Sequence, residues 1–223
     1  MPGIGPYCGA ASGFQPAAGH AIVIAMADPP KPRPAGPAPD RARLHDAALT
    51  HLSRFAATEA GLVRVLDRRI DRWVRRAALE GMDTDAAALS RRAAREVAAA
   101  LVQSGVVDDQ AFADARARRL TRAGRSRRAV QAHLAAKGVA GPLAQAALPD
   151  EGTELAAALA YARRRRLGPF RTVSDDTDEP NPDRMRRELG AMARAGFPQP
   201  VAQRALRMDR DAAAAMVIAL KQG

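Results

Sequence analysis

Few residues in this chain have both the type and the spacing that metal binding or catalysis requires. Asp108 and Asp109 form an adjacent pair of carboxylates, which could hold a metal ion or share a proton. A helix cap is the better interpretation, because a carboxylate just before a helix accepts the unpaired amide hydrogens of the first turn. His45 and His51 are six residues apart, whereas two imidazoles meet on one helix face at a spacing of three or four. We therefore expect no metal site and no cofactor.

The sequence also lacks the loops that recur in enzymes. It has no glycine-rich phosphate loop ending in Lys-Ser or Lys-Thr, no dinucleotide fingerprint and no serine between elbow glycines. Its single cysteine, Cys8, excludes an intramolecular disulfide and a cysteine-based zinc site. We expect a protein that is not an enzyme.

The strongest chemical signal is positive charge. The formal net charge is +11 over 223 residues, and of the 35 cationic residues only Lys31, Lys137 and Lys221 are not arginine. A GC-rich genome would favour arginine over lysine, but it explains the excess of cations over carboxylates less well. The composition therefore indicates a polyanion or an acidic protein surface as partner.

Arginines gather on the outer faces of two predicted helices. In the helix expected over about residues 59–79, apolar residues at helical spacing form one stripe and arginines form the opposite one. The helix that opens at Asp108 and Asp109 is divided in the same way. Side chains opposite a buried stripe face outward, so the contact candidates are Arg64, Arg68, Arg72, Arg118, Arg119 and Arg122.

A further run of cations, from Arg163 to Arg166, stands at a predicted helix end just before Gly168 and Pro169. Four cations in one turn cannot all face a core, so the run could dock phosphates; it could equally compensate the helix dipole with solvated side chains. One Trp and two Tyr are too few for a base-stacking platform. Contact with nucleic acid should therefore use the backbone charge and depend weakly on sequence.

Beyond residue 40 the composition predicts helices throughout. The chain is rich in Ala, Leu and Arg and poor in β-branched and aromatic residues. Thr58, Asp85, Asp108 and Ser126 are expected N-caps, and Pro142 fits a first helical turn. Apolar stripes are predicted at Leu44, Ala48, Leu52 and Phe55, at Leu62, Leu66, Ile70 and Trp73, at Leu89, Ala93, Val97 and Leu101, at Phe112, Ala113, Ala117 and Leu120, and at Leu155, Leu159 and Ala162.

An internal repeat sets the expected architecture. Residues 138–148 return at 196–206 with the same Gly, Pro, Ala, Gln, Ala and Leu, which indicates small units that bury their apolar faces against neighbours. We expect an all-α fold, an elongated tandem array of three-helix, helix-turn-helix-like repeats. The expected repeats cover residues 41–85, 86–150 and 151–223, the last with an acidic loop at 174–183 and a C-terminal helix that caps the array or frays.

Residues 1–40 hold nine prolines and predict a disordered Pro/Gly-rich leader. The apolar run at 21–27 resembles the core of a signal peptide, but no Lys or Arg precedes it. No apolar segment reaches the roughly 20 residues that span a bilayer. We expect a soluble, monomeric, cytoplasmic protein that does not contact a membrane.

The most specific motif runs from Gly105 to Ala113 and continues with Arg118, Arg122, Gly124, Val130, Leu134 and Lys137-Gly138-Val139. It resembles the central motif of the RecX family of bacterial recombination regulators. The resemblance covers residues 42–208: Thr58-Glu59-Ala60 with Leu62, Leu66, Arg68 and Arg69 looks like the first repeat, and Ala195-Gly196-Phe197 with Ala205-Leu206 looks like the close of the third. The family usually has a second glycine where Ser126 stands, so the turn after Gly124 could differ.

The resemblance implies a helical array that binds the RecA recombinase, lodges in the groove of the RecA filament on DNA and restrains its activities. We therefore predict a regulator that binds RecA and its DNA filament and mainly inhibits the recombinase in DNA repair and the SOS response. Single- or double-stranded DNA would be contacted through phosphates, and the family's basic positions add weight to Arg68, Arg118 and Arg122. The alternative is a helical DNA-binding protein that acts without RecA and binds bare DNA in a strongly salt-dependent way.

Overall fold

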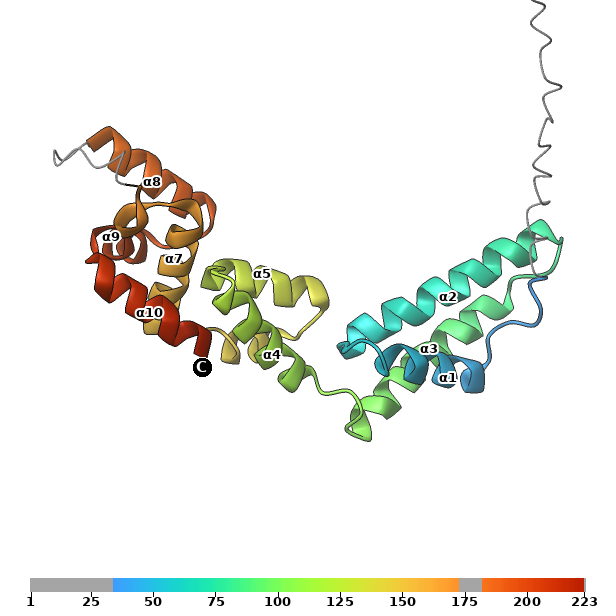
Figure 1. Ribbon diagram of the computed structural model, residues 1–223. Coiled ribbons are helices and arrows are strands. Elements are labelled where there is room, and N and C mark those ends of the chain that lie inside the picture. Colours follow the sequence, from blue (N-terminus) through green and yellow to red (C-terminus); the bar gives the residue numbers. More distant parts are fainter. Residues whose placement is uncertain (1–33, 173–181, 223) are drawn as a thin grey trace, which may run out of the picture. The chain divides into compact units, whose positions relative to one another are not determined.

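The computed structural model describes residues 34–172 and 182–222, and all regular secondary structure in these two ranges is helical (Figure 1). The all-α fold predicted from composition is thereby confirmed. Cys8, the apolar run at 21–27 and most of the expected acidic loop lie outside the described residues. In chain order the elements are α1 (Arg41–Leu52), α2 (Glu59–Leu79), α3 (Ala86–Gln103), α4 (Asp109–Arg122), α5 (Arg127–Lys137), α6 (Gly141–Ala146), α7 (Glu151–Arg165), the 3-10 helix η1 (Gly168–Phe170), α8 (Pro182–Arg194), α9 (Gln199–Arg207) and α10 (Arg210–Gln222).

Helix α2 is the central element of the first hydrophobic core. It begins after Thr58, as predicted, because the Thr58 Oγ1 accepts the Gly61 N–H at 2.9 Å. The large side chains of one face are buried against α1 and α3, which confirms the predicted stripe at Leu62, Leu66, Ile70 and Trp73. With this face buried, the arginines of α2 are left on the opposite, solvent-facing side.

Helix α3 packs into this same core, so the cores divide after α3 rather than at residue 85. Its buried face includes Val97 and Leu101, as predicted, but Leu89 is 73% exposed. Asp85 lies in a helical conformation and makes no side-chain cap hydrogen bond, contrary to the predicted role. An amphipathic pattern shows that a helix is covered on one side, but it does not say which neighbour covers it.

Residues 34–40 also belong to the folded structure, although the leader was expected to run to residue 40. The Trp73 Nε1–H donates to the Gly36 carbonyl at 3.0 Å, and the Ala35 N–H donates to Glu80 Oε1 at 2.9 Å. A buried indole N–H needs an acceptor, and an extended proline-rich segment carries carbonyls that no helix uses. The expected leader therefore cannot extend past residue 33.

The second core is built by α4, α5 and α6. Two predicted caps are confirmed: Asp108 Oδ1 accepts the Ala111 N–H at 2.8 Å, and Ser126 Oγ accepts the Ala129 N–H at 3.3 Å. Pro142 lies in the first turn of α6, also as predicted. The buried residues of this core are small or aliphatic, namely Ala113, Ala117, Val130, Leu134, Val139 and Ala144.

The third core gathers α7, α8, α9, α10 and η1. The predicted stripe of α7 is confirmed, since Leu155, Leu159 and Ala162 are buried. Helix α10 packs on α7 with Ala213 and Val217 buried, so it is part of this core rather than a frayed tail.

A helix-capping hydroxyl joins each unit to the next in the same way. Thr58, the N-cap of α2, donates its Oγ1–H to the Lys137 carbonyl at 2.7 Å. Ser126, the N-cap of α5, donates its Oγ–H to the Ala195 carbonyl at 2.7 Å. Ser126 thus makes two hydrogen bonds that a glycine, which has no side chain, could not make.

The backbone amide after each capping residue makes a second hydrogen bond between the units. The Glu59 N–H donates to Asp109 Oδ1 at 2.9 Å, and the Arg127 N–H donates to Glu154 Oε1 at 3.1 Å. A carboxylate at a helix N-terminus satisfies a free amide and favours the positive end of the helix dipole. Asp109 therefore acts as a link between units, while Asp108 caps its own helix.

Two glycines of the duplicated segment allow the close approach at these junctions. Gly138 and Gly196 follow the accepting carbonyls and have φ angles of +83° and +88°. A Cβ on Gly138 would lie 2.5 Å from the Ala60 Cβ, and a Cβ on Gly196 would lie 2.7 Å from the Ser126 Oγ. The repeated sequence thus marks the point where one unit touches the helix start of the preceding one.

Candidate binding groove between helices α2 and α4

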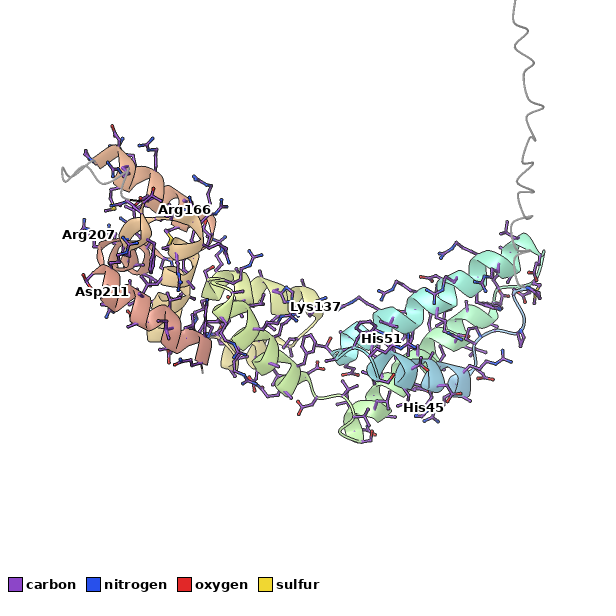
Figure 2. All side chains as sticks on the ribbon, viewed as in Figure 1. His45, His51, Lys137, Arg166, Arg207 and Asp211 are labelled. Carbon is purple, nitrogen blue, oxygen red and sulfur yellow. The ribbon has the colours of Figure 1, made fainter. Side chains whose placement is uncertain are left out.

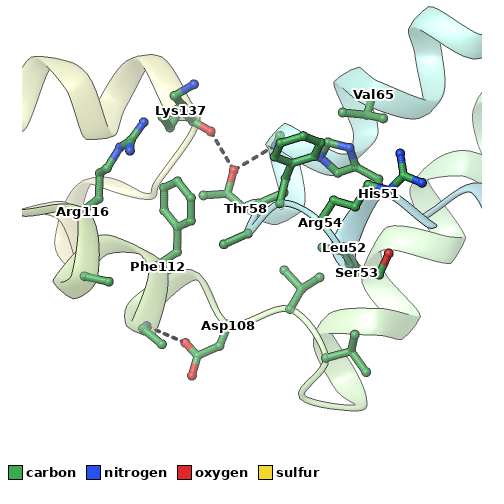
Figure 3. Close-up of a pocket in the computed structure, with 18 of the residues that line it drawn as sticks. His51, Leu52, Ser53, Arg54, Thr58, Val65, Asp108, Phe112, Arg116 and Lys137 are labelled. Carbon is green, nitrogen blue, oxygen red and sulfur yellow. Dashed lines mark hydrogen bonds between the residues drawn. The ribbon is translucent and has the colours of Figure 1, made fainter. Parts of the chain in front are cut away.

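The junction between α2 and α4 borders an open groove of about 1160 Å³ (Figure 3). Its walls come from the end of α1, the loop that leads into α2, the first turns of α2, and the facing sides of α4 and α5. In Figure 3, Phe112 and Arg116 stand on the α4 side, opposite Arg54 and Val65. The hydrogen bonds of Thr58 and Asp109 described above hold these walls together.

The floor and rim of the groove carry apolar side chains that the core does not cover. Phe55 is 61% exposed and Val106 is 53% exposed, although both are large apolar residues. Phe55 was predicted to extend the stripe of the first helix, but α1 ends at Leu52 and Phe55 lies beyond it, against His51 with ring centroids 5.4 Å apart. Exposed apolar groups next to half-buried ones such as Phe112 are typical of a protein-binding surface.

Positive charge surrounds these apolar groups. The groove is lined by six cationic residues and one carboxylate, Asp108, whose Oδ1 is occupied by its own helix start. Among the residues that the structure describes, this imbalance leaves the groove strongly cationic. The six cationic residues are Arg54, Arg64, Arg68, Arg116, Arg119 and Lys137.

The six cations divide into fixed and free side chains. The Arg64 Nη2–H donates to the Lys137 carbonyl at 2.7 Å, so Arg64 forms part of the junction. The Arg116 Nε–H donates to His133 Nε2 at 2.9 Å. The other four, Arg54, Arg68, Arg119 and Lys137, are exposed, and their charged groups make no hydrogen bond or ion pair with another described residue, so these groups are available to a ligand.

The charge of this region also acts on His133. Burial is the largest cause that lowers the pKa of His133 below its ordinary value, and the positive charges of Arg116, Lys137 and Arg125 lower it further. The neutral imidazole accepts the Arg116 hydrogen at Nε2, which places the ring proton on Nδ1. His133 is therefore a neutral acceptor that orients Arg116 along the wall of the groove.

The structure brings together three of the six predicted contact residues. Arg64, Arg68 and Arg119 line the groove, whereas Arg72, Arg118 and Arg122 are exposed elsewhere on α2 and α4. All six face outward, as the apolar stripes predicted. Which of them contact a partner stays a prediction.

Several lining residues were missed by the sequence analysis. Phe112 and Arg116 are four residues apart on one helix, so their spacing alone could have placed them on one face. Helical spacing could not have identified Arg54, Phe55 and Lys137. They follow or end helices, and they line the groove only because the first two units are in contact.

The groove offers groups that can bind a partner. Among residues 34–172 and 182–222, no three His, Cys, Asp or Glu side chains are grouped so that they could hold a metal ion. The same ranges contain no helix with the length and apolar character needed to cross a membrane. What the groove offers is apolar contact area flanked by free guanidinium groups.

Comparisons with known proteins agree on one family. A family model described as RecX, second three-helix domain, matches residues 108–148, which span α4 to α6. The Regulatory protein RecX of Myxococcus xanthus (strain DK1622) is 36% identical over 181 residues, which cover 80% of this chain and 89% of the relative. The Regulatory protein RecX of Agrobacterium fabrum (strain C58 / ATCC 33970) is 37% identical over 107 residues, which cover 48% of this chain and 55% of that relative.

Solved structures show the same fold. The crystal structure of RecX from Lactobacillus salivarius superposes with a TM-score of 0.54 at 13% identity, covering 75% of this chain and 94% of that chain. A crystal structure of regulatory protein RecX superposes with a TM-score of 0.50 at 17% identity, covering 73% of this chain and 70% of that chain.

Proposed function

The chain belongs to the RecX family of regulatory proteins, and from this premise we propose that it binds RecA and the RecA filament on DNA and mainly inhibits the recombinase. Its place would be in DNA repair and the SOS response, in the cytoplasm. The proposal needs no catalytic group and no cofactor, because occupation of the filament surface is itself the inhibitory act.

The observation that carries the proposal is the mixed character of the groove between α2 and α4. Exposed Phe55 and Val106 supply apolar contact area, and free Arg68 and Arg119 supply charge beside it. A protein surface with an apolar patch and carboxylates would match both features, since aromatic and arginine side chains dominate the energy of protein interfaces. A phosphate backbone would match only the charge.

The exposed arginines outside the groove suit the DNA of the filament. Arg72, Arg118 and Arg122 are exposed and have no ion-pair partner among the described residues. Such side chains neutralise phosphates with little sequence preference. In this proposal the groove contacts RecA, and these arginines contact DNA.

The direct test reverses the two free groove charges in the double variant Arg68→Glu and Arg119→Glu. We expect binding to the RecA filament to weaken by about tenfold or more, and inhibition of strand exchange to weaken with it, because like charges now face the partner. The matched control is Arg204→Glu and Arg207→Glu, two exposed arginines of α9 far along the chain from the groove residues.

The outcome is decided by comparing bare DNA with the same DNA covered by RecA. The proposal is supported if the unaltered protein and the control variant bind RecA-covered DNA much more tightly than bare DNA, and the groove variant does not. Unchanged inhibition by a groove variant with native helical content contradicts the groove assignment. Equal affinity of the unaltered protein for bare and RecA-covered DNA contradicts RecA binding and favours a DNA-binding protein that acts alone.

A further inference from the structure

A second cationic surface lies at the end of α7, outside the groove. Arg163, Arg164, Arg165 and Arg166 are consecutive and all exposed, and Figure 2 labels Arg166 at this end of the helix. We call these four residues the α7 cluster. In the part of the chain that the structure describes, none of the four forms an ion pair with a carboxylate.

Helix-dipole compensation does not account for every member of this cluster. A cation that compensates the dipole bonds the last carbonyls of its own helix or lies beside them. Arg164 instead bonds to a different helix: its Nη1–H donates to the carbonyl of Ala123, the residue after the end of α4, at 2.6 Å. This bond brings the ends of two helices together, each of which carries additional cations.

Tyr161 holds part of the cluster in place. The guanidinium carbons of Arg164 and Arg165 lie 5.6 and 5.9 Å from the centre of its ring. The ring is itself fixed, because it packs against Phe197 at 5.6 Å and its hydroxyl donates to the Ala191 carbonyl at 3.4 Å. A cation over an aromatic face is attracted to it, so Arg165 is oriented before any ligand arrives.

The last residue of the cluster is held in a conformation that a side chain disfavours. Arg166 has φ +56° and is the one non-glycine residue with positive φ in the described ranges. Glycine is the usual residue where a helix ends in this left-handed conformation. An arginine here keeps its charge exposed at the helix end at a cost in backbone strain.

Further cations lie beside the cluster among the described residues. Arg122 and Arg125, both exposed, flank Ala123, the residue that Arg164 contacts. The buried carboxylates of this unit are occupied, since Glu154 accepts the Arg127 N–H and Glu188 is bonded to Arg171. The bond from Arg164 to Ala123 thus brings the cations of the α7 end close to those that follow α4.

We propose that the α7 cluster, together with Arg122 and Arg125, binds the sugar-phosphate backbone of DNA. The charge fits a polyanion, and no large apolar residue of the α7 end is exposed, in contrast to Phe55 and Val106 in the groove. A protein partner would require such an apolar centre, whereas a phosphate backbone does not. The face of Tyr161 is covered by guanidinium groups, so base stacking and sequence preference are not expected. The inference rests on the proposed function, because the filament supplies the DNA. Binding to bare DNA tests the α7 cluster without RecA.

The experiment measures the affinity of the full chain for a bare single-stranded oligonucleotide as a function of salt. The variant is Arg163→Gln with Arg165→Gln, which removes two charges without introducing repulsion. We expect roughly tenfold weaker binding near physiological salt, and a slope of log affinity against log salt reduced by about 1.4, because each lost phosphate contact removes about 0.7 for single strands.

The matched control is Arg204→Gln with Arg207→Gln, which has the same charge change in the last turn of α9. If the control reduces the slope as much as the α7 variant, net charge alone governs binding and the proposal is overturned. An unchanged slope in the α7 variant also overturns it. Neither result touches the RecA assignment, since that depends on the gain in affinity with RecA present.

A single substitution separates a DNA contact from a structural role. Arg166→Gly relieves the left-handed conformation, so the melting temperature should stay the same or rise while affinity for the oligonucleotide falls. A stable Arg166→Gly variant that binds the oligonucleotide with full affinity and an unchanged salt slope would remove Arg166 from the proposed surface.

Discussion

At the scale of single residues, the surroundings of a side chain change the role that its type suggests. Phe55 is apolar yet mostly exposed, because the helix that would have carried it inward ends at Leu52. His133 is ionisable yet held neutral, because burial and nearby cations both oppose its protonation. Each of these residues borders or supports the groove rather than forming a core contact or a metal site.

The lowered pKa of His133 makes stability depend on pH with a definite sign. Because the unfolded chain binds this proton more readily than the folded chain, stability should fall as the pH drops below about 6.5, until the lower folded pKa is passed. Arg116→Gln removes one of the charges that oppose protonation, so the pKa of His133 should rise toward its ordinary value.

Proton NMR titration of the His133 ring, with the unaltered protein and with Arg116→Gln, measures this directly. Thermal melts at pH 7 and pH 5.5 give the change in stability. A His133 pKa that is the same in both proteins would show that the charge of Arg116 does not reach the ring.

At the scale of elements, helix starts and helix ends form the links between units. The hydroxyl that caps α2 reaches the last carbonyl of α5, and the hydroxyl that caps α5 reaches a carbonyl just after α8. The first amide of each capped helix reaches a carboxylate of the next unit. Groups that every helix leaves unsatisfied at its ends are thus used to fix the positions of the groove walls.

Gly138 should tolerate substitution poorly for two separable reasons. Gly138→Ala places a side chain on a positive φ and puts a Cβ 2.5 Å from Ala60, whereas Gly105→Ala has a positive φ with nothing within 4 Å. Backbone strain should lower the free energy of unfolding by about 1 to 2 kcal/mol in Gly105→Ala. Gly138→Ala should lose the same amount and about 1 to 3 kcal/mol more, because its Cβ overpacks the junction.

Denaturant unfolding of the two variants, side by side, measures the difference. The steric explanation requires the larger loss for Gly138→Ala, together with weaker binding at the groove, because Lys137 would be displaced from Thr58 and Arg64. Equal losses in the two variants would show that the junction yields to the added methyl group.

At the scale of the whole molecule, the described residues are stabilised by three separate cores. The first lies among α1, α2 and α3, the second among α4, α5 and α6, and the third among α7 to α10. In such an array, stability is approximately the sum of the units and their junctions, and units can open separately. The cationic surfaces lie on the outside of these units, where they can bind without disturbing a core.

Core substitutions should therefore act locally. Leu66→Ala removes a fully buried side chain from the first core, and Leu159→Ala removes one from the third. Each substitution should lower the free energy of unfolding of its own unit by about 2 to 5 kcal/mol. Hydrogen exchange should show lost protection in α1, α2 and α3 for Leu66→Ala and in α7 to α10 for Leu159→Ala. Uniform loss across all three units, in either variant, would show one cooperative unit instead.

Sequence patterns were enough to predict the helical class, the confirmed caps at Thr58, Asp108 and Ser126, and the outward direction of the six arginines. These features depend on hydrogen bonds and periodicity within a few residues, so a local pattern is enough to predict them. The family motif is also local to one unit and its neighbouring turns.

Which helices share a core and which side chains share a groove could be seen only once the helices were packed together. Helix α3 joined α1 and α2 because their buried faces fit, which no amphipathic pattern specifies. Lys137 and Phe55 reach one groove because Thr58 binds a carbonyl 79 residues away. Contacts at such separations depend on shape and on the partners left free after each helix has formed, and this information is not local to any stretch of sequence.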